Sequence, residues 1–363
     1  MTTESANNIP KKPITRKAAG RISKQLRKYE TGKAISPEEY LAAIDDAQRW
    51  RAQHALPTEN CFRALMDSAV MLPDAVISFR LKRMKSILAK IRRPGKDYQI
   101  GTMDDIGGCR MVLKDMRQVN EAVGILSERF TLKGGRSVKD YIHRPRNSGY
   151  RSYHLITLNQ GADREYRVEV QVRTQLQHLW STAVEAAGVI YEIDLKAERD
   201  LLDVSELERQ IRIFFTIVSS LFSLEEGTPQ VPGYEKARED LIREMHELDL
   251  LKSIVEDLSS VGDDVFLSEN GTRYDQAGFY LMRFATEMQF LDIGYYSPRH
   301  LEKALRDYDE CEGDALATGK TASLFHYDDV VLAYANDGEQ LGLAFPNYST
   351  KVGEFLEHVE PYI

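Results

Sequence analysis

The sequence has few cysteines and no long apolar run. Its three cysteines, Cys61, Cys109 and Cys311, are too few and too scattered for a disulfide framework or a zinc site. No stretch approaches the length of a membrane-spanning helix, and no signal-peptide pattern opens the chain. We therefore expect a protein without membrane contacts that works in a reducing cytoplasm.

Two common nucleotide-binding signatures are absent as well. The sequence contains no Walker A pattern and no glycine-rich kinase loop with a His-Arg-Asp partner. The composition is otherwise that of an ordinary globular protein, with 42% hydrophobic and 29% charged residues. A length of 363 residues fits two or three domains.

The charge is unevenly distributed along the chain. The formal net charge is −8, but Ser78 to His154 holds 18 Lys and Arg against 7 Asp and Glu. This local excess of +11 leaves −19 for the rest of the chain. A segment that concentrates cations in an acidic protein is suited to binding a small polyanion rather than to coating the protein with nucleic acid. A solvated basic face is the alternative.

The first 35 residues predict a basic, partly disordered N-terminal arm. Lys11 to Lys33 holds nine basic residues and one acidic residue, and we favour a solvated tail or frayed helix over an RNA-contacting arm. Ser36-Pro37-Glu38-Glu39 then predicts a helix start, with a helix to about His54. A second helix is expected from about Glu59 to Val70.

Residues 36–226 predict an α+β domain in which helices flank a mixed β-sheet. Leu81 to Arg93 is expected to be a helix. Strands are expected over Cys109–Leu113, Tyr153–Leu158 and Glu165–Arg173. The last of these alternates strictly, which places its whole polar set, including Glu169, on one face.

The C-terminal part is predicted to be separate from this domain. Residues 227–233 are rich in glycine and proline and predict a linker. Residues 234–363 predict a long helix followed by a small separate α+β domain, whose role the sequence leaves open. The elements expected there are a helix over Tyr234–Leu258, strands over Gly278–Ala285, Met288–Tyr295 and Asp329–Tyr334, and helices over His300–Cys311, Glu339–Phe345 and Val352–Val359.

Two cationic elements suit a phosphate-rich ligand. Lys139 to His154 reads KDYIHRPRNSGYRSYH, a loop bent by glycine and proline that combines cations with tyrosine rings. Lys82, Ser86 and Lys90 recur at spacings of four, which predicts one helical face that could hold a triphosphate. A solvated basic helix is the alternative for the second element.

Asp105 and Glu169 are the carboxylates of this cationic segment. Asp105 follows a turn at a strand mouth, and Glu169 lies on the alternating strand. Hard oxygen ligands whose shell is completed by phosphates are what a Mg²⁺ site needs. Taken alone, Asp105 is more often a turn-forming aspartate and Glu169 a residue of a strand surface.

Four motifs, in order, resemble the RelA/SpoT alarmone synthetase domain. They are R-x-K-x-x-x-S-x-x-x-K from Arg80, D-I-x-G-x-R from Asp105, K-D-Y-I-x-x-P with G-Y-R-S-x-H from Lys139, and E-x-Q-x-R-T-x-x-x-H from Glu169. They cover about residues 75–195, a third of the chain. The resemblance implies a nucleotidyltransferase-like synthetase core. In that family, pyrophosphate passes from ATP to the 3′-hydroxyl of GDP or GTP, which gives (p)ppGpp, a stringent-response signal, and AMP.

The resemblance also implies roles on the ATP side. Arg80 and Arg110 would sandwich the adenine, a role that planar guanidinium groups suit. Lys82, Ser86 and Lys90 would hold the ATP phosphates. Transfer of this kind depends on alignment and on neutralising spread negative charge, which accounts for the many cations.

The remaining implied roles concern catalysis and the acceptor. Asp105 would bind Mg²⁺, and Glu169 would share the metal and take the proton from the 3′-hydroxyl. Tyr150 would stack on the guanine, and Gln171 would help to position the nucleoside. The residues expected to face the acceptor phosphates are Lys139, Arg151 and His154.

The sequence departs from the family pattern at the acceptor loop. The usual Pro-Lys-x-Asn-Gly-Tyr stands here as Pro145-Arg-Asn-Ser-Gly-Tyr150. Ser148 in place of Asn leaves the preference for guanine over adenine less secure, and the preference for GDP over GTP undecided.

None of the eight histidines is followed by Asp, so the alarmone hydrolase of the long family members is not expected. Cys109, His178 and Trp180 are expected to pack inside the protein.

Two other hypotheses compete with (p)ppGpp synthesis. Toxic relatives in the same family move pyrophosphate to the 3′ end of tRNA or to adenine nucleotides, and the C-terminal domain could regulate such an activity. A non-enzymatic nucleotide sensor would need a broken catalytic set, whereas Asp105 and Glu169 are both present. Whether the chain forms homo-oligomers is left open.

Overall fold

The structure is a computed structural model of the chain. It describes residues 12–33, 35–72, 74–93, 97–135, 137–260, 266–267, 276–285, 290–316, 327, 329–336, 340 and 350–363. None of the helices in these ranges combines the length and apolar character that crossing a lipid bilayer requires.

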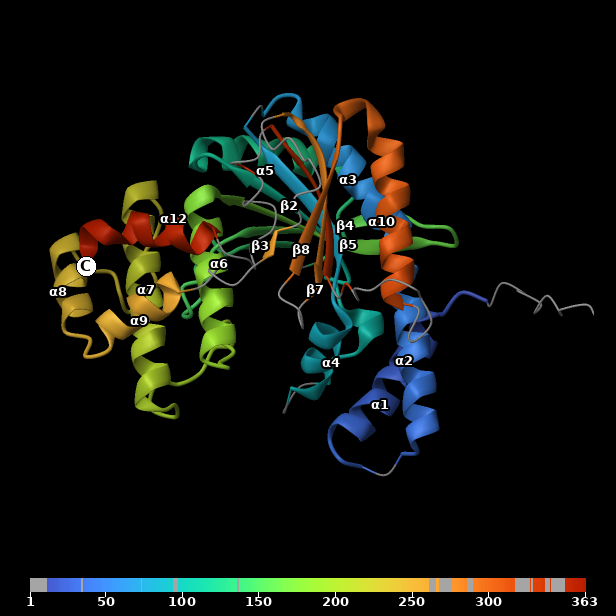
Figure 1. Ribbon diagram of the computed structural model, residues 1–363, viewed down its shortest axis with the longest axis horizontal. Helices are drawn as coiled ribbons and strands as arrows, with labels where there is room; N and C mark the ends of the chain where they lie inside the picture. Colours follow the sequence, from blue (N-terminus) through green and yellow to red (C-terminus); the bar gives the residue numbers. More distant parts are fainter. Residues whose placement is uncertain are drawn as a thin grey trace, which may run out of the picture.

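A single mixed β-sheet organises the described chain. Its strand order is β3-β4-β5-β2-β1-β9-β7-β8-β6 (Figure 1). β2 and β5 are parallel, and β1 is antiparallel to both of its neighbours, β2 and β9. The strands are β1 (Val76–Leu81), β2 (Gly107–Leu113), β3 (Val138–Asp140), β4 (Tyr153–Gln160), β5 (Glu165–Thr174), β6 (Phe266–Leu267), β7 (Gly278–Ala285), β8 (Phe290–Tyr296) and β9 (Asp329–Ala335).

Helices cover one face of the sheet. Side chains of α3 (Ala55–Ala69), α5 (Met116–Arg129) and α10 (Leu301–Leu316) pack against the strands in one apolar core that includes Phe62, Leu126 and Leu305. Figure 1 shows these three helices on the same side of the sheet. The opposite face of β1, β2 and β5 is therefore where polar side chains can gather.

A second core holds a helical lobe beside the sheet. It is formed by α6 (Gln175–Ile190), α7 (Glu206–Glu226), α8 (Arg238–His246), α9 (Leu251–Ser259) and α12 (Thr350–Val359). Local sequence explains two of the helix ends. Thr174 and Gln177 form a capping box at the start of α6, and α7 ends where Gly227 adopts a left-handed conformation with φ 63°.

The predicted N-terminal arm is a folded helix in its described part. α1 (Arg16–Glu30) packs against α2 (Pro37–Ala52), α4 (Met84–Arg92) and the 3₁₀ turn η1 (Ile100–Thr102). It buries Ala19, Ile22 and Leu26, while most of its basic residues are exposed. Arg27 is partly buried and donates to the Ile91 carbonyl at 3.2 Å. The expectation of a solvated tail or frayed helix was therefore wrong for these residues, because the apolar positions of the segment have the helical period.

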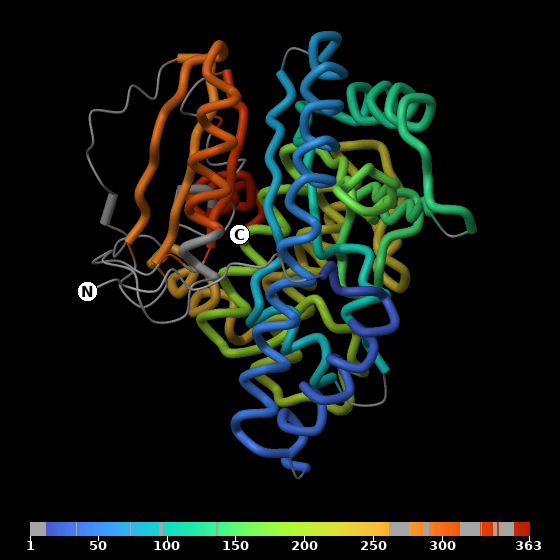
Figure 2. Tube along the Cα trace, turned by 90° about the vertical axis from the view of Figure 1, so that its right-hand side faces the viewer, coloured from blue at the N-terminus to red at the C-terminus, as the bar shows by residue number. Residues whose placement is uncertain are grey.

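The C-terminal segment, predicted as a separate domain, instead continues the sheet. β9 pairs with β1, so that Ser78 lies opposite Ala333. β7 and β8 extend the sheet further, and Figure 2 shows these strands alongside β1 and α3. The local pattern predicted these strands and the helix α10 correctly. It did not predict that β9 pairs with β1, since strand pairing between distant segments leaves no local signal.

Two local expectations also differ from the structure, and a third falls largely on residues that the structure does not describe. Arg80 and Leu81 belong to β1, and α4 begins only at Met84. The helix expected over Tyr234–Leu258 is divided into α8 and α9. The short helix expected over Glu339–Phe345 lies outside the described residues except for Gln340.

Candidate active site

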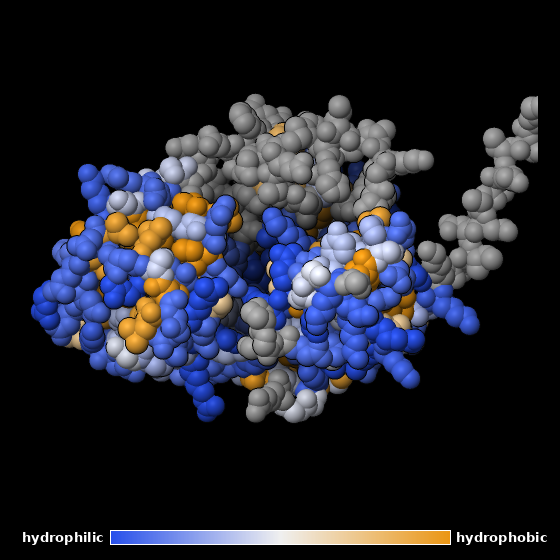
Figure 3. All heavy atoms as spheres, turned by 90° about the horizontal axis from the view of Figure 1, so that it is seen from below, coloured by the Kyte–Doolittle hydropathy of each residue, from blue (hydrophilic) through white to orange (hydrophobic). Residues whose placement is uncertain are grey.

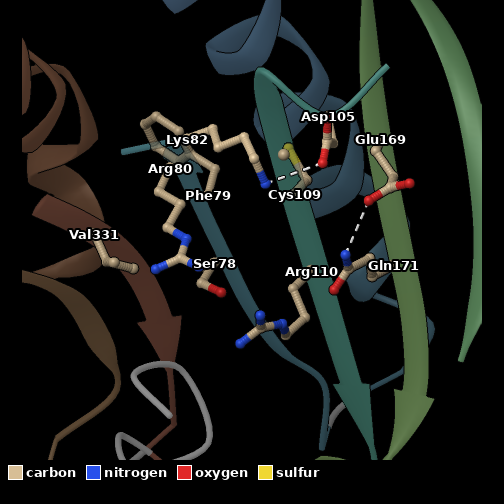
Figure 4. Close-up of a pocket in the computed structure, with 11 residues that line it drawn as sticks. Ser78, Phe79, Arg80, Lys82, Asp105, Cys109, Arg110, Glu169, Gln171 and Val331 are labelled. Atoms are coloured by element: carbon tan, nitrogen blue, oxygen red, sulfur yellow. Dashed lines mark hydrogen bonds and ion pairs between the residues drawn. The ribbon is translucent and has the colours of Figure 1, made fainter. Parts of the chain in front are cut away.

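The sheet register places the predicted residues in one row. Arg80 of β1 lies opposite Gly108 of β2, which lies opposite Glu169 of β5. Two residues further along, Arg110 of β2 lies opposite Gln171 of β5. Because residues two apart share a face, all of these side chains project from the same side of the sheet. They line a pocket with the residues Ser78, Phe79, Arg80, Lys82, Asp105, Gly108, Cys109, Arg110, Glu169, Gln171 and Val331 (Figure 4).

Asp105 is held between two lysines. Lys82 Nζ and Lys90 Nζ each lie 3.0 Å from its carboxylate. Burial raises the pKa of Asp105, but attraction to Lys82 and Lys90 outweighs burial, so the pKa lies below its ordinary value. The predicted phosphate-binding lysines thus converge on the predicted metal ligand, although Lys82 precedes the helix that carries Lys90.

Glu169 is the centre of a hydrogen-bonded group. His154 Nδ1 donates to Oε1 at 3.0 Å, and Gln171 Nε2 donates to Oε2 at 3.0 Å. Lys139 Nζ lies 3.9 Å from Oε1. Burial raises the pKa of Glu169, but His154, Gln171 and Lys139 together place it well below its ordinary value. The carboxylate is therefore ionised at neutral pH in the protein without bound nucleotides.

The two carboxylates are suited to a divalent cation. The charge on Glu169 raises the pKa of Asp105 in opposition to the two lysines, so the two carboxylates are close enough to interact. Within the described residues, no group of three or more His, Cys, Asp or Glu side chains is arranged to hold a metal ion. Two protein carboxylates with the remaining ligands supplied by phosphates and water is the set that Mg²⁺ commonly takes.

Three arginines crowd the other end of the row. Arg110 is half-buried, and burial together with Arg173 and Arg80 lowers the pKa of Arg110 to about 9. Its Nε has no hydrogen-bond partner among the described residues. Guanidinium groups that repel one another in a half-buried pocket are stabilised by an anion or by an aromatic ring stacked between them.

A carboxylate–lysine pair lies next to these arginines and was not predicted. Glu185 of α6 bonds with Lys196, and Lys196 lies over the Tyr150 ring, 5.9 Å from its centre. Burial, the largest single effect, raises the pKa of Glu185. The positive charges of Lys196, Arg110 and Arg80 together outweigh burial and lower the pKa to about 2. No motif marks either residue, because their contact with the pocket depends on how α6 crosses the sheet.

Tyr150 and His154 connect the acceptor loop to Glu169. The Tyr150 hydroxyl lies 2.9 Å from His154 Nε2. In the tautomer in which Nδ1 donates to the Glu169 carboxylate, Nε2 is the acceptor for the tyrosine hydroxyl. Tyr141 packs edge-on against both rings. The loop thus presents an aromatic group beside the ionised carboxylate.

Six predicted residues are not among the described residues that line the pocket: Ser86, Lys90, Lys139, Tyr150, Arg151 and His154. Lys90 reaches it through Asp105, and Lys139 and His154 through Glu169, with Tyr150 bonded to His154. Ser86 and Arg151 have no such contact with a lining residue among the hydrogen bonds and ion pairs of the described structure.

Ser86 lies on α4, one turn before Lys90. Arg151 is 3% exposed, and its guanidinium donates to Ser219 Oγ at 3.0 Å and to the Ile142 carbonyl at 3.2 Å. Burial lowers the pKa of Arg151 to about 10. These contacts anchor the loop, and the predicted contact of Arg151 with acceptor phosphates stays a prediction.

The residues that depart from the family pattern face a different cavity. Asn147 and Ser148 line a cavity between the acceptor loop and the helical lobe, together with Phe215 and Tyr234. Gly149 closes the loop in a left-handed conformation with φ 86°, and a Cβ there would lie 2.8 Å from Trp180. Ser148 therefore lies behind Tyr150 rather than in the row of charged residues, and its effect on acceptor choice stays a prediction.

The three residues expected to pack inside the protein do so. Cys109 is 3% exposed, and His178 and Trp180 are buried on α6. Trp180 Nε1 donates to the Phe215 carbonyl at 2.7 Å, and His178 bonds with Arg173 at 2.7 Å. Cys109 also forms part of the pocket wall, where burial raises the pKa of its thiol well above the ordinary value.

Known proteins resemble the part of this chain that supplies most of the pocket residues. Residues 79–195 match the family model described as a region found in RelA / SpoT proteins. GTP pyrophosphokinase YjbM of Bacillus subtilis is 30% identical over 152 residues, which are 38% of this chain and 71% of that protein. The chain belongs to the RelA/SpoT family.

Other RelA/SpoT proteins share the same segment. The probable chloroplastic GTP diphosphokinase RSH3 of Arabidopsis thaliana is 30% identical over 137 residues, which are 38% of this chain but only 18% of that protein. The crystal structure of small alarmone synthetase 1 from Bacillus subtilis is 25% identical, with a TM-score of 0.38, and covers 52% of this chain and 92% of that one. This RelA/SpoT chain has an α+β fold with a mixed sheet flanked by helices, as predicted.

Proposed function

We propose that the protein is a pyrophosphokinase that transfers the β,γ-pyrophosphate of ATP to the 3′-hydroxyl of GDP or GTP. The products are (p)ppGpp and AMP. One observation carries the proposal. The register of β1, β2 and β5 places Arg80, Arg110, Glu169 and Gln171 on one face of the sheet, where they line a pocket together with Lys82 and Asp105. The relatives named as GTP pyrophosphokinases support the reaction class.

The donor side has the charge that ATP requires. Arg80 and Arg110 present planar cations at one end of the pocket for the adenine, while Lys82 and Lys90 lie at the other end for the phosphates. In the described structure, both lysines are paired with the single carboxylate of Asp105. A nucleotide with its Mg²⁺ would replace this pairing, so that the lysines bind phosphate oxygens and the carboxylate binds the metal.

The reaction needs a proton acceptor on the other side. The 3′-oxygen of the acceptor attacks the β-phosphorus of ATP, the bond between that phosphorus and the α,β-bridging oxygen breaks, and AMP leaves. The hydroxyl proton passes to Glu169, whose Oε1 is already fixed by His154. Phosphates brought next to Glu169 raise its pKa by like-charge repulsion, which makes the carboxylate a stronger base in the complex than in the free protein. A bound Mg²⁺, held by Asp105 and Glu169, would neutralise charge on the transferred group.

The test is a product assay with matched variants. The purified protein is incubated with ATP, Mg²⁺ and GDP or GTP, and nucleotides are separated by ion-exchange chromatography. AMP and a 3′-pyrophosphorylated guanine nucleotide are expected in equal amounts, and neither is expected from Glu169→Gln. If ATP is not consumed with any purine acceptor, the proposed reaction is wrong, and tight nucleotide binding without turnover would indicate a sensor.

Transfer to tRNA or to an adenine nucleotide is the second candidate reaction, and one assay separates it from the first. ATP labelled in its β- and γ-phosphates is incubated with guanine nucleotides, adenine nucleotides and tRNA together. Label in guanine nucleotides supports (p)ppGpp synthesis, whereas label in tRNA or in adenine nucleotides supports the second candidate. The basic segment that suggested tRNA is the folded helix α1, whose apolar side packs against the protein.

A cytoplasmic location and a homo-oligomeric state are also part of the proposal. Size-exclusion chromatography with light scattering tests the oligomeric state.

A further inference from the structure

The C-terminal strand β9 contributes a buried carboxylate to the ATP side of the pocket. Asp329 is 2% exposed, and its Oδ2 accepts a hydrogen bond from Arg80 Nη1 at 3.1 Å. Arg83 Nη1 lies 3.6 Å from the same oxygen. Val331, two residues further along β9, lines the pocket, and Figure 4 shows it on the strand next to Arg80.

This contact leaves Arg80 free to stack. Asp329 meets one terminal nitrogen of the guanidinium, so it can hold the edge of the group while the flat faces stay available. The Arg80 side chain is 30% exposed, whereas that of Asp329 is 1% exposed. The carboxylate of Asp329 therefore holds Arg80 from the buried side, and the Arg80 guanidinium faces the pocket.

The contact also balances charge in the arginine group. Arg80 lowers the pKa values of Arg110 and Arg173, which shows that the three cations repel one another. A buried carboxylate bound to Arg80 offsets this repulsion and keeps the side chain within the group. Without Asp329, Arg80 would gain free energy by turning out into solvent.

Helix α10 fixes the backbone immediately after Arg80. The Tyr308 hydroxyl accepts a hydrogen bond from the Leu81 amide at 3.2 Å. Glu312 binds Arg51 through both carboxylate oxygens, at 2.6 and 3.1 Å. Arg51 in turn donates to the Lys82 carbonyl at 2.7 Å. All three side chains, those of Tyr308, Glu312 and Arg51, are buried. Two elements of the C-terminal segment therefore act on adjacent residues of the proposed donor site.

We propose that Asp329 is a positioning residue for the donor nucleotide: it holds the Arg80 guanidinium in the orientation that stacks on the adenine. The proposal rests on the function proposed above, because it assigns Arg80 to ATP. It follows that the C-terminal segment is a structural part of the ATP site of this RelA/SpoT protein. The segment is not an appendage whose removal leaves ATP binding intact.

The chain offers a matched control for Asp329→Asn. Asp292 of β8 is also buried, at 6% exposure, and is paired with an arginine, Arg283, in the same part of the sheet. It lies on the second strand beyond β9 and is not among the described residues that line the pocket. Asp292→Asn therefore makes the same chemical change at comparable burial without touching Arg80.

The experiment measures binding of donor and acceptor separately by calorimetry. The probes are α,β-methylene-ATP with Mg²⁺, which lacks the bond that is broken, and GDP. Asp329→Asn is expected to weaken α,β-methylene-ATP about tenfold, because a charge-assisted hydrogen bond that orients the arginine is lost. GDP binding should change less than about twofold, and Asp292→Asn should alter neither.

Two further variants make the result specific to Arg80. In an Arg80→Ala background, Asp329→Asn should cause no additional loss of α,β-methylene-ATP binding, whereas independent effects would add. Asp329→Glu keeps the charge and moves the carboxylate by one methylene, so it should weaken binding less than the Asn variant. It provides the same test if the Asn variant does not fold.

The outcomes separate this proposal from the proposed function. If Asp329→Asn is folded and binds α,β-methylene-ATP as tightly as the wild type or more tightly, the positioning role is wrong. Tighter binding would mean that the carboxylate competes with the nucleotide. That result would leave the reaction standing if the wild type still makes AMP. Absence of α,β-methylene-ATP binding by the wild type would overturn the positioning role directly.

Discussion

Nδ1 of His154 lies 3.0 Å from Oε1 of Glu169, and the two residues come from neighbouring strands, β4 and β5. The histidine fixes one oxygen of the carboxylate, and its other nitrogen accepts from Tyr150. These two hydrogen bonds join the predicted acceptor loop to the proposed base, so acceptor binding at Tyr150 would also affect the orientation of Glu169. A hollow is visible between the helical lobe and the N-terminal helices on the face shown in Figure 3.

Replacing the proposed base should abolish the reaction without unfolding the protein. Glu169→Gln keeps the side-chain size but removes the proton acceptor and one metal ligand. We expect kcat to fall by about 10²- to 10⁴-fold, measured as AMP formation. Glu165→Gln, at the exposed start of the same strand, is the control and should keep wild-type activity. Comparable activity of both variants would exclude Glu169 as the base.

Substitutions of the adjacent residues Asp104 and Asp105 should have different effects on the Mg²⁺ dependence of the reaction. Asp105 faces the pocket between Lys82 and Lys90, whereas Asp104 pairs with Lys133 and Arg167. Asp105→Asn should lower kcat at least about a hundredfold and raise the Mg²⁺ concentration for half-maximal activity. Asp104→Asn should leave the Mg²⁺ dependence unchanged. A Mg²⁺ titration of both variants checks this, and equal Mg²⁺ requirements would argue against Asp105 as a ligand.

Filling the floor of the pocket should block ATP. A Cβ at Gly108 would lie 3.9 Å from the Glu169 carbonyl and 4.0 Å from that of Arg80, which are ordinary contacts. Gly108→Val should therefore fold, but its methyl groups would occupy the space between the arginines and the carboxylates. We expect the KM for ATP to rise roughly tenfold or more, with a smaller rise for Gly108→Ala. An unchanged KM for ATP in a folded Val variant would place ATP elsewhere.

Arg151 should matter first for stability. Arg151→Ala leaves Ser219 and the Ile142 carbonyl without their buried donor. We expect the free energy of unfolding, measured in urea, to fall by about 1–3 kcal/mol. Arg144→Ala, an exposed arginine of the same loop, is the control. Unchanged stability of Arg151→Ala together with weak GDP binding would instead support a contact with acceptor phosphates.

The charge on Glu185 should appear in the acid stability of the protein. Its pKa is depressed to about 2 in the folded state from an ordinary value of 4.5. The contribution of Glu185 to stability is therefore fully present above about pH 4.5 and is lost as the pH falls toward 2. Glu185→Gln should be less stable at pH 7, and its stability should fall less steeply across this range. Urea unfolding at successive pH values tests this against exposed Glu128→Gln, which should follow the wild type.

The sequence alone predicted which residues make up the candidate site and what chemistry they would carry. Spacing and alternation placed Glu169 and Gln171 on one face of a strand and put Asp105 at a strand mouth, because these properties depend on neighbours in the chain. The four motifs determined the family. The helices and most strands followed from local periodicity and caps, including α2, where Ser36 and Glu39 form the capping box.

Only the tertiary structure decided which distant residues share the pocket. Nothing near Asp329 in the sequence indicates that β9 pairs with β1, because strand pairing is set by the packing of both faces of the finished sheet. The same holds for Lys196 over Tyr150 and for Arg151, whose burial depends on α7. A charged side chain carries no local mark of whether it binds ligand or scaffold, since that depends on the partners that folding brings within hydrogen-bond distance.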